Sequence, residues 1–289
     1  MRALACLFVA LQATFSVRTE MVVLPVTVSD ARGHSVAGLA ETNFRVYDEG
    51  RLQPITFFRG GDVPITIGLV VDHSQSMGLK LAAVNAAAVA FARSGRAGDE
   101  LFVVTFSDRV RTLPLGGQLF TSDPAVLDGA LVAEPPGGRT ALYDAVAEAL
   151  RHLTSGRSDR KALVVVTDGG DNASHLKYRG VRDLARESQA VIYGIGLIGA
   201  EFQDENPEIL KRLCRDSGGV AYFPGAPRDV AGAFVEIARD MREQYTLGFV
   251  PGAAKSGKAF HTVKVTALGP TGNRLRVRTR SGYSMRPPT

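Results

Sequence analysis

The chain has 289 residues, of which 45% are hydrophobic and 22% charged, and its formal net charge is +5. This composition is ordinary for a globular protein of one large or two modest domains, and it excludes a disordered chain. The basic excess is small and comes without the aromatic-interleaved basic motif of a nucleic-acid binder, so nucleic acid is not expected as a partner.

The first segment, residues 1–16, has the pattern of a short secretory signal. Arg2 supplies one positive charge, and the apolar run after it is too short to span a bilayer as a helix. Ala13 and Ser16 are candidate ends of this segment. The pattern predicts an exported protein, secreted or held in the cell envelope, with a cytoplasmic location as the alternative. No other segment reads as transmembrane, and Cys214 is expected as a buried small hydrophobe.

Residues 17–60 alternate between polar and apolar positions. Short strands are expected at 22–28, 44–50 and 53–58, separated by turns rich in Gly and Asp. A period of two with such turns predicts antiparallel β-structure.

Between residues 61 and 243 the rhythm changes to strands that alternate with helices. Strands are expected at 65–71, 100–106, 162–167, 190–195 and 219–223, and helices at 79–93, 123–131, 140–153, 180–188, 207–217 and 228–244. This alternation predicts an α/β domain with a mostly parallel central sheet covered by helices on both faces.

The first strand of this domain runs directly into an Asp-x-Ser-x-Ser turn formed by Asp72, Ser74 and Ser76. Ligands of parallel sheets gather just past the carboxyl ends of the strands, which is where this turn falls. One carboxylate and two hydroxyls on alternate residues offer three oxygens to one point, and a hard cation suits that point. Helix capping is the simpler explanation for the serines alone.

Two later segments add oxygen-bearing side chains of the same kind. Thr140 follows the pair Gly137-Gly138 at the start of a helix, and Asp168 ends the apolar strand 162–167. With these two residues the chain resembles a von Willebrand factor type A domain of the bacterial VWFA-related type, with a complete metal-ion-dependent adhesion site. The family's first motif matches Asp72, Ser74 and Ser76, its threonine matches Thr140, and its second aspartate matches Asp168.

The resemblance implies a Rossmann-like fold, Asp72 held partly through water, and an ion with one open coordination position. Mg²⁺ is the expected ion, with Mn²⁺ or Ca²⁺ as alternatives. Two carboxylates and three neutral hydroxyls leave the ion incompletely neutralised, so an Asp or Glu side chain of a partner protein can complete its shell. The expected function is therefore a non-enzymatic, adhesion-type protein-binding module.

Three alternatives remain at this stage. The first is a metal-dependent hydrolase that uses the ion as a Lewis acid; no phosphate-binding loop of the Gly-x-x-x-x-Gly-Lys type supports it. The second is an intracellular adaptor subunit of an ATPase or chelatase complex. The third is an ion that only holds three loops together.

Several neighbours of the five residues have simpler expected roles. His73 should point away from the ion, and Asp171 and Asn172 should shape their loop through hydrogen bonds with the backbone. Asp144, four residues beyond Thr140, could hold a loop of the site.

Residues 244–289 return to strands, expected at 245–250, 261–267 and 275–283. Each end of the chain alone has too few strands to bury a core, so this segment is expected to pair with residues 17–60 in a small β-sandwich-like domain. Four arginines at alternate positions should share one face of the last strand: Arg274, Arg276, Arg278 and Arg280. A solvated face that discourages edge pairing is expected, with an anionic surface as an alternative partner.

Overall fold

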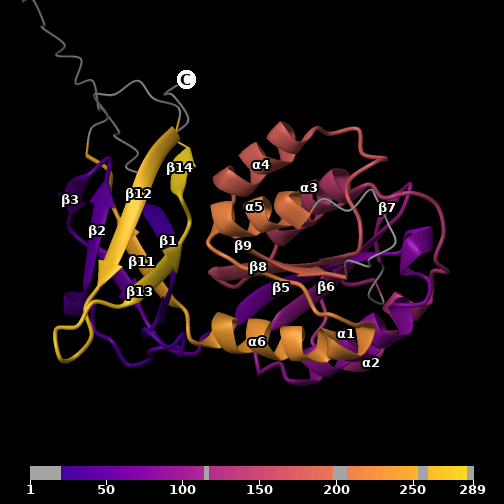
Figure 1. Cartoon of the computed structure of the whole chain (residues 1–289), viewed down its shortest axis with the longest axis horizontal. Coiled ribbons are helices and arrows are strands. Elements are labelled where there is room, and N and C mark those ends of the chain that lie inside the picture. The colour runs from indigo at the N-terminus through magenta and orange to yellow at the C-terminus, as the bar shows by residue number, and fades with distance from the viewer. Residues whose placement is uncertain (1–20, 114–116, 198–206, 253–259, 285–289) are drawn as a thin grey trace, which may run out of the picture.

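The computed structural model describes residues 21–113, 117–197, 207–252 and 260–284. The predicted signal segment, 1–16, lies outside these ranges. The chain forms an α/β domain beside a β-sandwich, and both ends of the described chain belong to the sandwich (Figure 1).

The α/β domain is built on a six-stranded sheet, which confirms the predicted fold class. Its strand order is β10-β9-β8-β5-β6-β7. The bounds are β5 (Ile65–Asp72), β6 (Glu100–Phe106), β7 (Val110–Thr112), β8 (Arg160–Thr167), β9 (Val191–Gly196) and β10 (Ala221–Tyr222). The sheet is mixed because β7 pairs antiparallel with β6, whereas the other neighbours are parallel. This three-residue edge strand is too short to stand out in the sequence.

Helices cover both faces of this sheet (Figure 1). One face carries α1 (Leu81–Arg93), α2 (Pro124–Val132) and α6 (Val230–Arg242), and the other carries α3 (Leu142–Leu153), α4 (Tyr178–Glu187) and α5 (Pro207–Ser217). Short 3₁₀ turns at Gln75–Met77 and Pro227–Asp229 precede α1 and α6.

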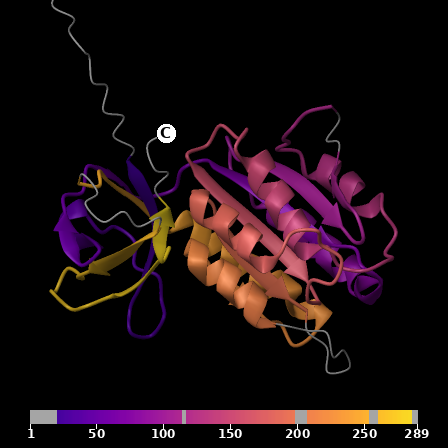
Figure 2. The ribbon, with the colours of Figure 1, turned by 90° about the horizontal axis from the view of Figure 1, so that it is seen from above.

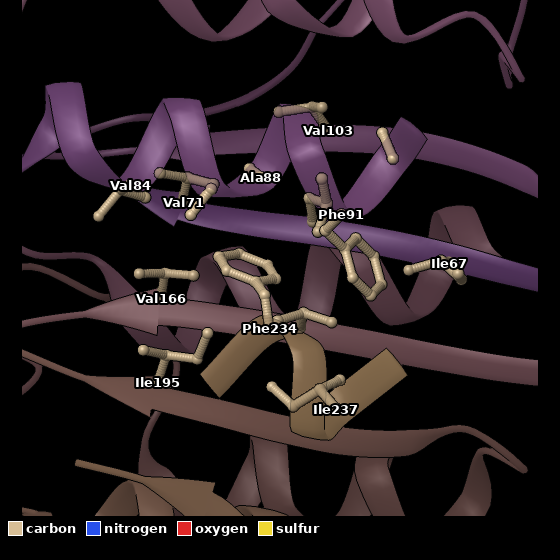
Figure 3. Packing of buried hydrophobic residues seen from close by; sticks show 14 of the residues in the cluster. Ile67, Val71, Val84, Ala88, Phe91, Val103, Val166, Ile195, Phe234 and Ile237 are labelled. Carbon is tan, nitrogen blue, oxygen red and sulfur yellow. The ribbon is translucent and has the colours of Figure 1, made fainter. Parts of the chain in front are cut away.

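The core between α1, α6 and the sheet is apolar and closely packed (Figure 3). Phe91 of α1 and Phe234 of α6 lie with ring centroids 5.3 Å apart, above Val71 and Val166 of the central strands. Full burial of one such side chain stabilises the fold by roughly 1.5–3 kcal/mol. This core holds the carboxyl ends of β5 and β8 in fixed register.

The sandwich consists of two four-stranded sheets, and each of them combines strands from the N-terminal and the C-terminal segment. The first sheet has the order β13 (Arg276–Thr279), β1 (Val22–Ser29), β11 (Tyr245–Phe249) and β4 (Phe57–Arg59). The second has the order β14 (Gly282–Ser284), β12 (Phe260–Ala267), β2 (Phe44–Asp48) and β3 (Arg51–Gln53). A 3₁₀ turn at Glu41–Asn43 precedes β2.

Two of the segments that were predicted as single strands each divide between two sheets, so these two predictions are wrong. The segment expected at 53–58 contributes to both sheets, because Pro54 cannot donate a ladder hydrogen bond and β3 and β4 lie on either side of it. The segment expected at 275–283 likewise divides into β13 and β14, which lie in different sheets.

The sandwich contacts the amino ends of the parallel strands. Arg160, at the start of β8, donates to the Gly61 carbonyl at 2.9 Å and to the Gln244 carbonyl at 2.5 Å. Burial lowers the pKa of this guanidinium to about 10. The carboxyl ends of β5 and β8 therefore lie at the opposite end of the α/β domain, away from the sandwich (Figure 2).

The expected solvated arginine face is wrong for two of its four members. Arg274 and Arg276 are exposed. Arg278 instead donates to Asp240 of α6 at 2.5 Å, and the buried Arg280 donates to the carbonyls of Gly282 and of Arg186. The strand ends at Thr279 and packs against the α/β domain, so the idea of an anionic surface as partner loses its basis.

Within the described ranges, no helix combines the length and the apolar character that a bilayer crossing requires.

Candidate metal centre

The candidate site lies where the order of the central sheet reverses. β5 pairs with β6 on one side and with β8 on the other, so the connections from these strands leave in opposite directions. Asp72 is the last residue of β5, and Asp168 follows the last residue of β8. Because Val71 pairs with Val166, the two aspartates emerge side by side. Such a crevice is where open α/β sheets bind ligands.

An open pocket of about 600 Å³ occupies this crevice. Four of the five predicted ligand residues line it, namely Ser74, Ser76, Thr140 and Asp168. The fifth, Asp72, is fully buried behind them. The structure thus brings together side chains from three separate segments, as expected of parallel strands whose carboxyl ends share one edge; metal binding itself stays a prediction.

Both carboxylate oxygens of Asp72 accept hydrogen bonds. Oδ1 accepts from the Ser74 backbone N–H at 2.8 Å, and Oδ2 accepts from the Thr167 hydroxyl at 2.6 Å. Burial raises the pKa of Asp72 to about 6, although these two residues act in the opposite direction. A cation in the adjoining pocket would favour the charged form of this carboxyl.

The two serines and Asp168 form a connected row of oxygens. Ser74 Oγ lies 3.2 Å from Ser76 Oγ, and Ser76 Oγ donates to Asp168 Oδ1 at 2.8 Å. Ser74 occupies the N-cap position of the 3₁₀ turn, yet its side chain makes no capping hydrogen bond. Helix capping therefore does not account for this hydroxyl, which faces the pocket instead.

Thr140 is held in place by hydrogen bonds with the loop that follows β8. Its backbone N–H donates to Asn172 Oδ1 at 2.8 Å, and its carbonyl accepts from the backbone N–H groups of Asn172 and Ala173 at 3.0 and 3.1 Å. Asn172 thus shapes the site through hydrogen bonds with the backbone, as predicted. These hydrogen bonds connect its loop to the loop of Thr140, whereas the prediction concerned only its own loop.

The glycines before Thr140 allow the two ligand loops to meet. The Gly138 carbonyl accepts from the Gln75 backbone N–H at 3.1 Å. Gly138 has a φ of +77°, and a Cβ there would lie 2.1 Å from Asp108 Oδ2. The left-handed backbone conformation therefore favours glycine at this position, and a Cβ would displace the exposed side chain of Asp108.

Asp144 of α3 supports a loop of the site, a role that its position four residues beyond Thr140 had suggested. Its carboxylate accepts from the backbone N–H groups of His175 at 2.8 Å and of Leu176 at 2.9 Å. Burial, the largest single effect, raises the pKa of this carboxyl, but the hydrogen bonds from His175 and Leu176 outweigh it and hold the pKa below its usual value.

The remaining neighbours also have structural roles. Asp171 Oδ1 accepts from the Tyr143 backbone N–H at 3.1 Å. His73 is buried with its Nδ1 3.1 Å from the Glu134 carbonyl, away from the pocket, and burial lowers its pKa. Cys214 is fully buried, and burial raises the pKa of its thiol, which makes it the small hydrophobe that was expected.

Two residues of the site escaped the sequence analysis. Thr167 donates to Asp72, and the sequence signal for it is a hydroxyl directly after the aliphatic run 162–166. Lys80 donates to Asp168 Oδ2 at 2.5 Å and to the Leu197 carbonyl at 3.2 Å. Nothing in the sequence pairs Lys80 with an acid so far along the chain.

The donor set fits a hard cation. Within the described part of the chain, no group of three or more His, Cys, Asp and Glu side chains could hold a metal. A metal at this pocket would therefore depend on hydroxyl oxygens beside two carboxylates, which suits Mg²⁺, Mn²⁺ or Ca²⁺ and not a metal that prefers thiolate or imidazole.

Comparison with known proteins agrees with this geometry. The model of the von Willebrand factor type A domain matches residues 66–231. The chain belongs to this family. The matched segment begins in β5 and ends at the start of α6, so it includes all five predicted ligand positions. No curated protein matches the sequence.

Solved structures of von Willebrand factor type A domains are similar in fold. The von Willebrand factor type A protein from Catenulispora acidiphila is 15% identical, covers 79% of this chain and 74% of its own, and has a TM-score of 0.56. The vWF domain of a type V pili tip protein from Porphyromonas gingivalis is 14% identical, with 62% and 95% covered and a TM-score of 0.50. The PilB minor pilin from Streptococcus sanguinis is 15% identical, with 67% and 64% covered and a TM-score of 0.50. At these identities the likeness concerns the fold alone.

Proposed function

We propose that this protein is an exported, non-enzymatic binding module that holds Mg²⁺ at the carboxyl end of its sheet and uses it to bind an acidic group of a partner protein. The observation that carries the proposal is the convergence of Ser74, Ser76, Thr140 and Asp168 on one open pocket, with Asp72 buried behind them.

The residues of the site would contribute to cation binding in different ways. Asp168 supplies charge at the pocket wall, and Ser74, Ser76 and Thr140 supply neutral oxygens. Asp72 adds a second charge from behind and fixes the Ser74 backbone. When bound, the ion supplies a positive charge with an open coordination position. A carboxylate from a partner would form a charge-assisted contact there.

The surroundings of the pocket suit a protein ligand. Arg139 lines the pocket, with a side chain 69% exposed, and its guanidinium contacts Asp108 at 3.0 Å. Leu79, also in the lining, is 99% exposed. A cationic group and an apolar side chain beside the metal would add specificity for an acidic residue flanked by apolar ones.

A binding role accounts for the pocket better than catalysis does. Among the described residues, those that line the pocket include neither histidine nor cysteine. His73, the nearest histidine in sequence, contacts a backbone carbonyl elsewhere. The pilin and the pili tip protein with similar folds support a role at the cell surface, in agreement with the signal-like pattern at residues 1–16.

The test is capture of partner proteins from a cell-envelope extract in Mg²⁺, with and without a chelator. Ser76→Ala and Asp168→Ala should lose the captured protein, as should the parent in chelator. The control is Ser94→Ala, because Ser94 donates to the Phe91 carbonyl at the end of α1, away from the pocket. A partner bound equally well by Asp168→Ala, or by the parent in chelator, contradicts the proposal.

A further inference from the structure

Lys80 places a positive charge inside the candidate metal centre. Its Nζ lies 2.5 Å from Asp168 Oδ2, and the Asp168 side chain is only 1% exposed. The Lys80 side chain itself is 15% exposed. Asp168 is thus paired with a cation in the structure, on the oxygen that Ser76 does not use.

Local structure does not explain why a lysine stands at this position. Lys80 is the N-cap residue of α1, where its side chain makes no capping hydrogen bond. Cations are unfavourable at the amino end of a helix because the free N–H groups there carry partial positive charge. The first turn of α1, which the structure describes in full, contains no acidic residue to offset this. A residue that breaks local preference in this way points to a role in the site.

Hydrogen bonds hold the backbone of Lys80 in place beside the pocket, and its long side chain can still change direction. The Lys80 N–H donates to the Met77 carbonyl at 2.8 Å, and the Lys80 carbonyl accepts from Val84 N–H at 3.1 Å. The Lys80 side chain is 15% exposed, and its partner Asp168 lines the open pocket of the site. The flexible four-carbon side chain allows the ammonium to reach either Asp168 or solvent.

We propose that Lys80 is a tethered cation that competes with the divalent ion for Asp168. In the metal-free protein its ammonium neutralises a buried carboxylate that would otherwise lack a counter-charge. When metal binds, Lys80 withdraws to solvent, because an ammonium beside a divalent cation in a poorly solvated site is strongly repelled. Lys80 thereby weakens metal binding and stabilises the empty site. This inference rests on the proposed metal site.

The test compares metal affinity in three variants by isothermal titration calorimetry with Mn²⁺ and Mg²⁺. Lys80→Met removes the charge and keeps the length, and it should bind metal on the order of tenfold more tightly. Lys80→Arg keeps the charge and should show little or no gain. Lys161→Met is the control for net charge, since Lys161 lies at the start of β8, where it donates to the Thr154 carbonyl, and its affinity should equal that of the parent.

Two further measurements separate competition from a general effect on folding. Without metal, Lys80→Met should melt at a lower temperature than the parent, because Asp168 loses its counter-charge, and saturating Mg²⁺ should remove the difference. In the parent, acylation of Lys80 by an amine-reactive reagent, followed by mass spectrometry, should become faster in saturating Mg²⁺, whereas Lys161 should be unaffected.

The outcomes distinguish the two proposals. If the parent binds no divalent ion, the metal site and the role of Lys80 both fail. If the parent binds metal but Lys80→Met binds it no more tightly, or if Mg²⁺ does not change the acylation of Lys80, the metal site stands and the competition is refuted.

Discussion

Replacement of Asn172 tests whether hydrogen bonds between loops set the geometry of the metal site. The Asn172 side chain does not need to touch the ion, because its Oδ1 accepts the Thr140 backbone N–H at 2.8 Å and so positions a predicted ligand. In Asn172→Ala this N–H has no side-chain acceptor. The backbone hydrogen bonds from Asn172 and Ala173 to the Thr140 carbonyl remain, so the loop should stay attached.

The size of the effect follows from that single hydrogen bond. Loss of an acceptor in a half-buried place costs about 1 kcal/mol. If the position of Thr140 that binds metal becomes less stable by this free energy, metal affinity falls about fivefold, since 1.4 kcal/mol corresponds to about a factor of ten. The assay is calorimetric titration with Mn²⁺, together with urea unfolding of the metal-free protein.

Asn43→Ala is the matched control. Asn43 Oδ1 accepts the Ala40 backbone N–H at 2.9 Å, and its Nδ2 donates to the Leu268 carbonyl at 3.0 Å, in the sandwich and far from the pocket. Asn43→Ala should therefore lose at least as much stability as Asn172→Ala, but only Asn172→Ala should lose metal affinity. Equal metal affinity in the two variants would refute the role of Asn172.

Three further predictions concern the stability of the fold. Gly138→Ala should destabilise the protein by about 1–3 kcal/mol, because a φ of +77° strains alanine and the new Cβ would push the Asp108 carboxylate away from Arg139, whereas Gly33→Ala, with a φ of +89° but open space, should cost less in urea unfolding. Arg278→Met should destabilise by about 3 kcal/mol, because it removes the cationic partner of the buried Asp240 and leaves that carboxylate only its hydrogen bonds from hydroxyl groups, and addition of Asp240→Asn should recover part of that loss; a fully additive double mutant would contradict the pairing. The lowered pKa of Asp144 means that its contribution to stability is present above the unfolded pKa, about 4, and is lost as pH falls through the folded value. The stability difference between the parent and Asp144→Asn should therefore shrink on acidification from pH 7 to pH 3, and a constant difference would be inconsistent with this contribution.

The predicted ligands are recognisable in the sequence because of how parallel sheets are built. Asp72, Ser74 and Ser76 are close in the chain, and Asp168 ends a second apolar strand. Since parallel strands end at one edge, these segments had to meet if both strands belonged to the same sheet. Thr140 joined them through its position after a glycine pair at the start of a helix.

The wrong or missed predictions concern tertiary contacts, which the alternation of polar and apolar residues along a strand does not encode. Alternation placed Arg278 on one face of a strand, but it does not say whether another domain covers that face, and α6 does so through Asp240. Lys80 was missed because its partner Asp168 lies 88 residues later, and only the packed structure brings them together. The division between β3 and β4 depends on which sheet each short strand joins.

The most direct test of the metal site is a crystal structure with Mn²⁺, read from its anomalous scattering. We predict an anomalous peak in the pocket within about 2.4 Å of oxygens from Ser74 and Ser76, with Thr140 and Asp168 in the first shell or one water away. Asp72 should remain behind them, and Lys80 should have left Asp168. A crystal with ample Mn²⁺ and no peak in this pocket, or with its peak at other residues, would contradict the central claim.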